Sequence, residues 1–185
     1  MTRDPEKYKF DGRRVKYGNI ILLQSGAGAG KSFAILPLAI NFIKQINPKL
    51  LNNIWVASTC PVSKTKEGME AANKDNTAAK KLISQWKLNS NNAFTRHQLM
   101  NMISSEWHET LNDELELEIS EADAETDYDA GLQKYNFKLR QYNKSDLPDI
   151  IIIDEIADYS ELDMELIDRF AKRNEIQVIA AGDLS

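Results

Sequence analysis

Residues 25–32 read SGAGAGKS and directly follow the apolar run Ile20–Leu23. Glycines let consecutive backbone N–H groups point inward in conformations that a side chain would forbid. Lys31 can then reach the β and γ phosphates of a nucleotide, and the Ser32 hydroxyl can ligate Mg²⁺. The pattern predicts a site for ATP or GTP, formed by Ser25, Gly26, Ala27, Gly28, Ala29, Gly30, Lys31 and Ser32.

The flanking elements support this interpretation. The full phosphate-loop pattern GxxxxGK(S/T) begins with glycine, and Ser25 takes that position here. An apolar strand precedes the loop, and Phe33, Leu36, Ile40 and Ile43 predict an amphipathic helix after it, with Phe42 and Ile46 widening its apolar stripe. The positive end of that helix dipole would add to the loop amides. The alternative is a glycine-rich turn in an ordinary α/β protein.

A second chemical segment is DIIIIDE, an apolar run that ends in Asp154 and Glu155. At the carboxyl end of a strand, Asp154 can hold Mg²⁺ through its water shell, and Glu155 can orient and deprotonate an attacking water. Lys31 would stabilise the charge that develops on the γ phosphate. We therefore expect hydrolysis, with Lys31 and Glu155 catalytic and Ser32 and Asp154 as metal ligands. The alternative is a solvated acidic pair at a strand end.

Three segments, in the order SGAGAGKS, IIIIDEIAD and VIAAGDLS, resemble motifs I, II and III of superfamily 1 helicases. The resemblance implies the first RecA-like motor domain of such a helicase, with ATP and Mg²⁺ as cofactors and Asp183 close to the γ phosphate. Motif III usually continues as GDxxQ, whereas this sequence stops at Ser185. We therefore expect residues 1–185 to be a single RecA-like domain of a longer protein. A second RecA-like domain or subunit would supply an arginine finger.

Two weaker segments agree with the resemblance. TCPVSKT (59–65) is similar to helicase motif Ia, TAPTxKA, and AFTRHQLM (93–100) is similar to motif Ib. Both motifs line the single-strand track in the family. The alternatives are a plain strand-to-helix turn for the first segment and a helix cap for the second. The resemblance implies four contacts to single-stranded nucleic acid, with DNA favoured over RNA: Pro61, Lys64, Thr95 and His97.

Apolar runs alternate with helical patterns along the chain, which predicts a three-layer α/β fold with a mostly parallel central sheet. The run Ile150–Ile153 lacks polar alternation, as expected of a strand covered on both faces. Trp55, Trp86 and Trp107 are expected in the core rather than stacked on bases. The expected strands are 19–24, 53–58, 92–95, 150–154 and 176–182. One helix is expected directly after the phosphate loop, and others at 64–86, 98–111 and 161–173. The helical stretch 64–86 is expected to break near Asn76.

Residues 106–144 do not fit this rhythm, and we expect them to form an insertion at the rim of the sheet, helical in part near 129–141. The RecD-like branch of the helicases carries a small subdomain in this position. Residues 106–129 contain eleven acidic side chains and no lysine or arginine, which leaves 17 acids and 23 bases elsewhere. The rest of the chain is therefore moderately basic, which is compatible with binding a phosphate backbone despite the net charge of −5, although it falls well short of a basic stripe.

Composition narrows the cellular context. The single cysteine, Cys60, excludes an internal disulfide and a cysteine-cluster zinc site. No apolar stretch has the length of a membrane span, and the charged N-terminus lacks the apolar region of a secretory signal. We expect a cytoplasmic protein without a membrane partner, of cellular, phage or plasmid origin.

Two other functions remain open from the sequence. A phage DNA-packaging ATPase also pairs a serine-ending phosphate loop with an apolar strand closing in Asp-Glu. A nucleotide-dependent interaction module with little hydrolysis would instead use the acidic insertion to recruit a partner. Residues 1–18 contain no glutamine that could read adenine, so the preference for ATP over GTP follows from the family resemblance alone.

Overall fold

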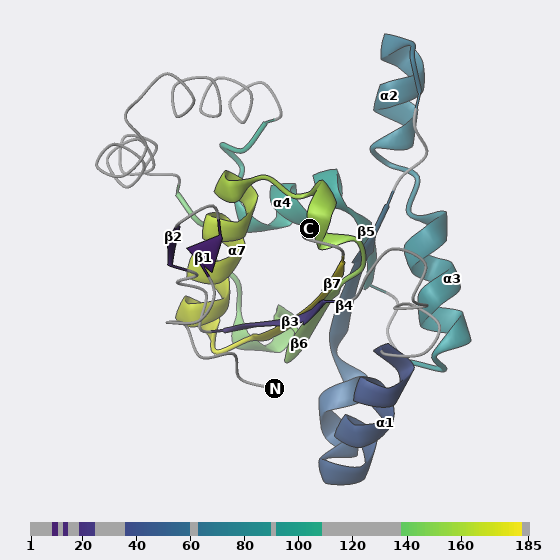
Figure 1. Cartoon of the computed structure of the whole chain (residues 1–185), viewed down its shortest axis with the longest axis vertical. Coiled ribbons are helices and arrows are strands. Elements are labelled where there is room, and N and C mark those ends of the chain that lie inside the picture. Colours follow the sequence, from purple (N-terminus) through teal and green to yellow (C-terminus); the bar gives the residue numbers. More distant parts are fainter. Residues whose placement is uncertain are drawn as a thin grey trace.

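A computed structural model describes residues 9–10, 13–14, 19–24, 36–59, 63–89, 92–108 and 138–182 of the chain. Its centre is a five-stranded sheet in which every strand pair is parallel, with the order β3-β7-β6-β4-β5 (Figure 1). The strands are β3 (Ile20–Gln24), β4 (Ile54–Ser58), β5 (Asn92–Thr95), β6 (Ile150–Ile153) and β7 (Gln177–Gly182). A separate antiparallel pair joins β1 (Lys9–Phe10) to β2 (Arg13–Arg14).

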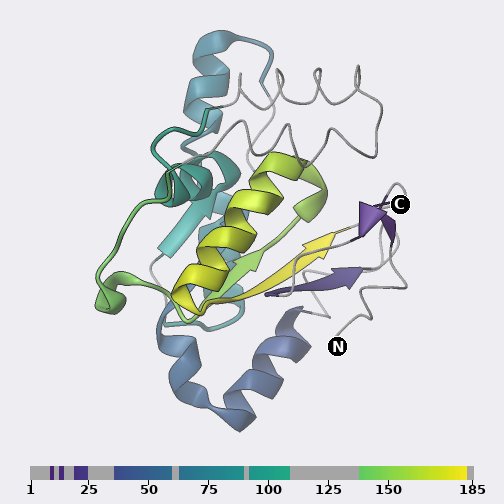
Figure 2. The same cartoon turned by 90° about the vertical axis from the view of Figure 1, so that its left-hand side faces the viewer.

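Helices cover both faces of this sheet, which confirms the predicted three-layer α/β fold. One face packs against α1 (Leu36–Ile46), α3 (Thr77–Gln85) and the short helix η2 (Pro48–Asn52). The other packs against α4 (Arg96–Ile103) and α7 (Glu161–Asn174). Helix α2 (Lys66–Ala72) extends away from the sheet (Figures 1 and 2), and its one buried residue is Ala72. Two further short helices are η3 (Lys144–Asp146) and η4 (Ile156–Asp158).

The apolar run of β6 explains why two cores form. Ile151 and Ile153 belong to the core on the α4 and α7 side, whereas Ile150 and Ile152 belong to the core on the α1 and α3 side. Alternate side chains of a strand point to opposite faces, so a strand covered twice has to be apolar throughout. The three tryptophans lie in these cores, as predicted, with exposed fractions of 2 % for Trp55, 8 % for Trp86 and 2 % for Trp107.

The strand order brings the chemical segments to one edge of the sheet. Because all five strands are parallel, the residues that follow each strand emerge at the same carboxyl edge. Strand β7 lies between β3, which leads into residues 25–32, and β6, which leads into Asp154. Ligands of open parallel sheets bind outside this edge. The predicted strands are all present within about two residues of their expected bounds.

The helix predicted over 98–111 is wrong at both ends. Helix α4 begins at Arg96 because Thr95 and Gln98 form a capping box, and it ends at Ile103. Ser104 is extended, and its hydroxyl donates to the Lys138 carbonyl at 2.9 Å. The backbone N–H of Arg140 likewise donates to the Ile103 carbonyl at 2.8 Å. The returning chain thus binds the end of the helix and stops it.

The described edges of the expected insertion pack against the core. Trp107 is buried among the residues of α4 and α7, and Leu139 and Tyr142 pack against the same core. Residues 138–143 have no helical structure, in contrast to the helix expected near 129–141. Ten of the eleven acidic side chains of this stretch lie within 109–129, outside the described residues. None of the helices in the described parts of the chain has the length and apolar character needed to cross a bilayer.

Candidate functional site

Asp154 follows β6 at the carboxyl edge, and two neighbouring groups of β4 hold it. Its backbone N–H donates to the Ala57 carbonyl at 2.9 Å, which extends the strand pairing by one residue. The Ser58 hydroxyl donates to Asp154 Oδ2 at 3.3 Å. Asp154 is only 8 % exposed and Ser58 4 %. A buried carboxylate with a fixed orientation at this edge suits a hard cation such as Mg²⁺.

Glu155 adopts a left-handed backbone conformation, with φ 61° and ψ 58°. For a residue with a Cβ this conformation costs about 1 kcal/mol or more, and such strain is concentrated at functional positions. Here it turns the chain sharply from β6 into η4. Glu155 is half-buried and directly follows Asp154 at the carboxyl edge.

Gly182 ends β7 against the turn that contains Glu155. A Cβ at this position would lie 2.7 Å from Ile156 Cγ2, 3.0 Å from the Ile156 nitrogen and 3.3 Å from the Ala157 nitrogen. Only glycine lets the two backbones approach this closely. Gly182 is thus fitted to the turn after Asp154. This contact was not anticipated from sequence; its signal is the glycine that interrupts the apolar run of VIAAGD.

A pocket of about 290 Å³ opens beside Asp154. Its walls come from the ends of β4 and β6, from α2, from the start of α4 and from the segment around η4. The polar and aromatic residues that line it include Ser58, Asn73, Arg96, His97, Asp154 and Tyr159. The pocket therefore joins the predicted metal ligand to a residue predicted to lie on the nucleic-acid track.

Arg96 and Asp163 form a fixed anchor at one wall of this pocket. Arg96 Nε donates to Asp163 Oδ2 at 2.8 Å, and Trp107 Nε1 donates to Asp163 Oδ1 at 2.7 Å. The Ser160 backbone N–H also donates to Oδ2, at 3.0 Å, and Asp163 is fully buried. The Arg96 guanidinium lies 5.5 Å from the ring centre of Trp107. Sequence reasoning missed this anchor, because its partners are 56 or more residues apart.

The expected track residues have different surroundings. Thr95 is fully buried; its hydroxyl accepts from the Gln98 N–H at 3.1 Å and donates to the Asn73 carbonyl. Its side chain is a helix cap here, and a contact to a bound strand would require it to leave that position. His97 lines the pocket, with its ring edge-on to Trp107 at 5.0 Å. Lys64 is exposed just before α2.

Several predicted site residues lie outside the described part of the chain, and their roles stay predictions. They comprise the whole phosphate loop, Ser25, Gly26, Ala27, Gly28, Ala29, Gly30, Lys31 and Ser32, together with Pro61 and Asp183. The described residues just before the phosphate loop and just before Asp183 show where these two segments start. Gln24 is paired with Gly182 in the register of β3 and β7, so residues 25 and 183 leave neighbouring strands.

The family model of an AAA domain matches residues 14–185, which include all five strands of the sheet and the carboxyl-edge site. Domains of this family are found in UvrD-, Rep- and RecD-like helicase-type P-loop proteins. No curated protein matches the sequence significantly.

Proposed function

The chain belongs to this family of AAA domains, and on that premise we propose that it binds Mg·ATP and hydrolyses it as a motor domain of a nucleic-acid helicase or translocase. One observation carries the proposal: Asp154 and Glu155 follow β6 at the carboxyl edge, where Gly182 at the end of β7 packs against Ile156, and only β7 separates β6 from β3. This arrangement supports a two-part site in which the phosphate loop faces the carboxylates across β7.

The proposed roles follow from charge and position. Lys31 and the amides of residues 25–32 bind the phosphates, and Ser32 and Asp154 hold Mg²⁺, which when bound neutralises phosphate charge. Glu155 orients a water molecule and accepts its proton. Asp183 senses the γ phosphate from the end of β7. The Ser58 hydroxyl keeps the Asp154 carboxylate in place through its hydrogen bond.

We propose single-stranded DNA as the track. The pocket that contains Asp154 also contains His97, so a strand at His97 would lie next to the nucleotide site. Exposed Lys64 offers charge to a phosphate backbone. Residues 109–137 separate the segment after α4 from β6, at the position of the inserted subdomain of the RecD-like branch, and this supports membership of that branch.

A second RecA-like domain or subunit completes the proposed site. Phosphoryl transfer in such motors uses an arginine that approaches the γ phosphate. Arg96, which lines the same pocket as Asp154, forms an ion pair with buried Asp163 and lies over the ring of Trp107. This supports an arginine donated from outside the domain, and we expect the isolated chain to bind nucleotide but to turn it over slowly.

Equilibrium binding of a fluorescent ATP analogue tests the metal site without requiring turnover. The wild-type chain should bind the analogue more tightly when Mg²⁺ is added. In Asp154→Asn, this Mg²⁺-dependent increase in affinity should be at least tenfold smaller. Asp149→Asn is the matched control, because Asp149 is exposed at the other end of β6. An Asp154→Asn variant with the same Mg²⁺ dependence as the wild type would contradict the assignment.

A further inference from the structure

Helix α1 carries a row of exposed apolar side chains. Leu38, Phe42 and Ile46 are 68 %, 64 % and 67 % exposed, whereas Leu36 and Ile40 of the same helix are buried in the core. Their spacing of four residues places them in one row along the helix. Among the described residues the only other large apolar side chain this exposed is Met69 of α2. Contiguous apolar surface of this kind marks interaction sites.

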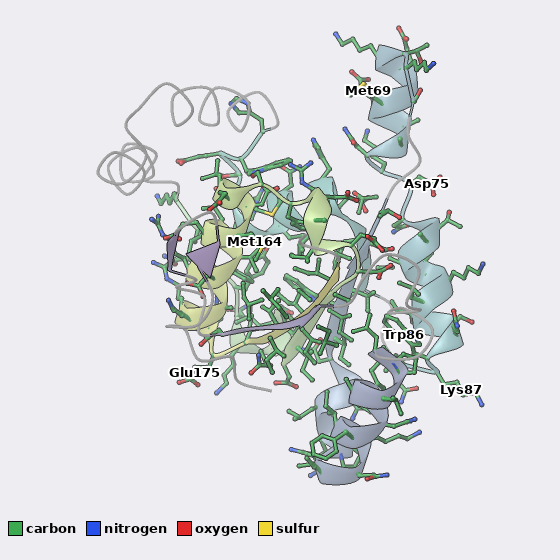
Figure 3. All side chains as sticks on the ribbon, in the orientation of Figure 1. Met69, Asp75, Trp86, Lys87, Met164 and Glu175 are labelled. Atoms are coloured by element: carbon green, nitrogen blue, oxygen red, sulfur yellow. The ribbon has the colours of Figure 1, made fainter. Side chains whose placement is uncertain are left out.

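The layer around this row is basic. Helix α1, η2 and α3 with the residues just after it contain no aspartate or glutamate. They contain five exposed lysines: Lys44, Lys49, Lys80, Lys81 and Lys87. Lys87 lies just after the end of α3 (Figure 3). A partner for this face should therefore offer an apolar row within an acidic segment.

The chain itself contains such a segment. Residues 109–129 have ten acidic side chains and no lysine or arginine. Within them, Leu111, Leu115 and Ile119 repeat the spacing of four residues seen on α1. On a helix these three side chains would lie in one row, flanked by carboxylates. Apolar spacing and charge thus both match the α1 face.

The sheet lies between this segment's attachment points and α1. Trp107 and Leu139, which flank the segment, pack into the core on the α4 and α7 side. The Lys138 N–H donates to Glu106 Oε2 at 3.0 Å, which joins the two attachment points. Helix α1 covers the opposite face (Figure 1). The geometry therefore favours docking onto another molecule over folding back on the same one.

We propose that the α1 row binds the acidic segment 109–129 of a second copy of this chain. The contact joins different surfaces of the two copies, so it is head-to-tail. A symmetric pairing of α1 with α1 is disfavoured, because it would bring lysines together.

Sedimentation equilibrium of the purified chain tests this contact. The wild type should self-associate with a strength that falls as salt is raised. Phe42→Glu and Leu115→Lys should each weaken association at least tenfold. Asn41→Glu is the control: it adds the same charge to α1, about 100° around the helix from Phe42, and should change association less than about threefold. Phe42 is 64 % exposed, so its replacement leaves the fold intact.

Mixing the two variants distinguishes the modes of assembly. Phe42→Glu keeps an intact acidic segment and Leu115→Lys keeps an intact α1 row, so an equimolar mixture should form a dimer and nothing larger. If Leu115→Lys self-associates as strongly as the wild type, the proposal is wrong and the symmetric pairing of α1 with α1 is supported instead. A wild type that is monomeric at all concentrations would also overturn it. Co-sedimentation of that monomer with phosphatidylserine vesicles, lost in Phe42→Glu, would identify a membrane surface instead.

Discussion

Replacement of Gly182 by alanine should misplace Glu155 without unfolding the domain. The added methyl would lie 2.7 Å from Ile156 Cγ2 and 3.0 Å from the Ile156 nitrogen. A rotamer change could relieve the first contact but not the second, because the nitrogen belongs to the backbone. The first turn of η4 therefore has to move by several tenths of an ångström, and Glu155 moves with it.

The expected magnitude follows from two opposing effects. Overpacking of a dense site costs about 1–3 kcal/mol. Alanine also restricts the unfolded chain, which returns about 0.4–1 kcal/mol. Urea denaturation should thus show the free energy of unfolding reduced by about 1–2 kcal/mol. A displacement of a catalytic group by as much as ~1 Å costs up to about 100-fold in rate. We expect single-turnover ATP hydrolysis to fall at least tenfold, with nucleotide affinity changed by less than about threefold.

A double-mutant cycle with Ile156→Ala isolates the contact. Ile156→Ala removes the nearer obstructing atom, so the double variant should be more stable than the sum of the two single effects predicts, by about 0.5–1 kcal/mol. Two results would refute the reasoning. One is a Gly182→Ala variant with wild-type stability and hydrolysis, and the other is a variant whose hydrolysis falls only because nucleotide no longer binds.

Two further predictions concern stability. Burial raises the pKa of Asp168 above its ordinary value of 3.8, although a hydrogen bond from Lys172 opposes the shift. The folded state thus holds its proton to higher pH than the unfolded state does, and stability is lost as pH rises through the folded-state pKa. In thermal melts at increasing pH from about pH 3, the melting temperature of the wild type should fall relative to that of Asp168→Asn. Curves of melting temperature against pH that run parallel for the two proteins would contradict a raised pKa of Asp168. Glu175 caps the C-terminal end of α7 (Figure 3), where its φ of 55° is strained for a residue with a Cβ. Glu175→Gly should therefore raise the free energy of unfolding by about 0.5–1 kcal/mol in urea titrations. A destabilised variant would show that this conformation is not strained.

Features that depend on neighbouring residues could be predicted from the sequence. Four of the five strands of the sheet are mainly apolar segments of four to six residues, β5 (NAFT) being the exception, and the break between α2 and α3 coincides with the polar sequence NKDN (73–76). The burial of Trp55 follows from its place in such a run. These patterns report local periodicity and burial, which the sequence displays directly.

Features that depend on distant residues could not be predicted. Helix α4 stops at Ile103 because Arg140, thirty-seven residues later, binds its last turn. Ser58 and Asp154 are 96 residues apart, and Arg96 and Asp163 are 67 apart. Thr95 illustrates the same limit: the sequence allowed both a track contact and a cap, and burial by the Asn73 segment decides its place in this structure. Such pairings are fixed by the order of strands in the sheet.

The central claim is that Glu155 activates water at a nucleotide site formed at the carboxyl edge of the sheet. Single-turnover hydrolysis of ATP by excess protein, compared with equilibrium nucleotide binding, tests it most directly. We predict that Glu155→Gln binds ATP within about threefold of the wild type and hydrolyses it at least 100-fold more slowly, whereas Asp149→Asn matches the wild type in both. Hydrolysis by Glu155→Gln at the wild-type rate would contradict the account.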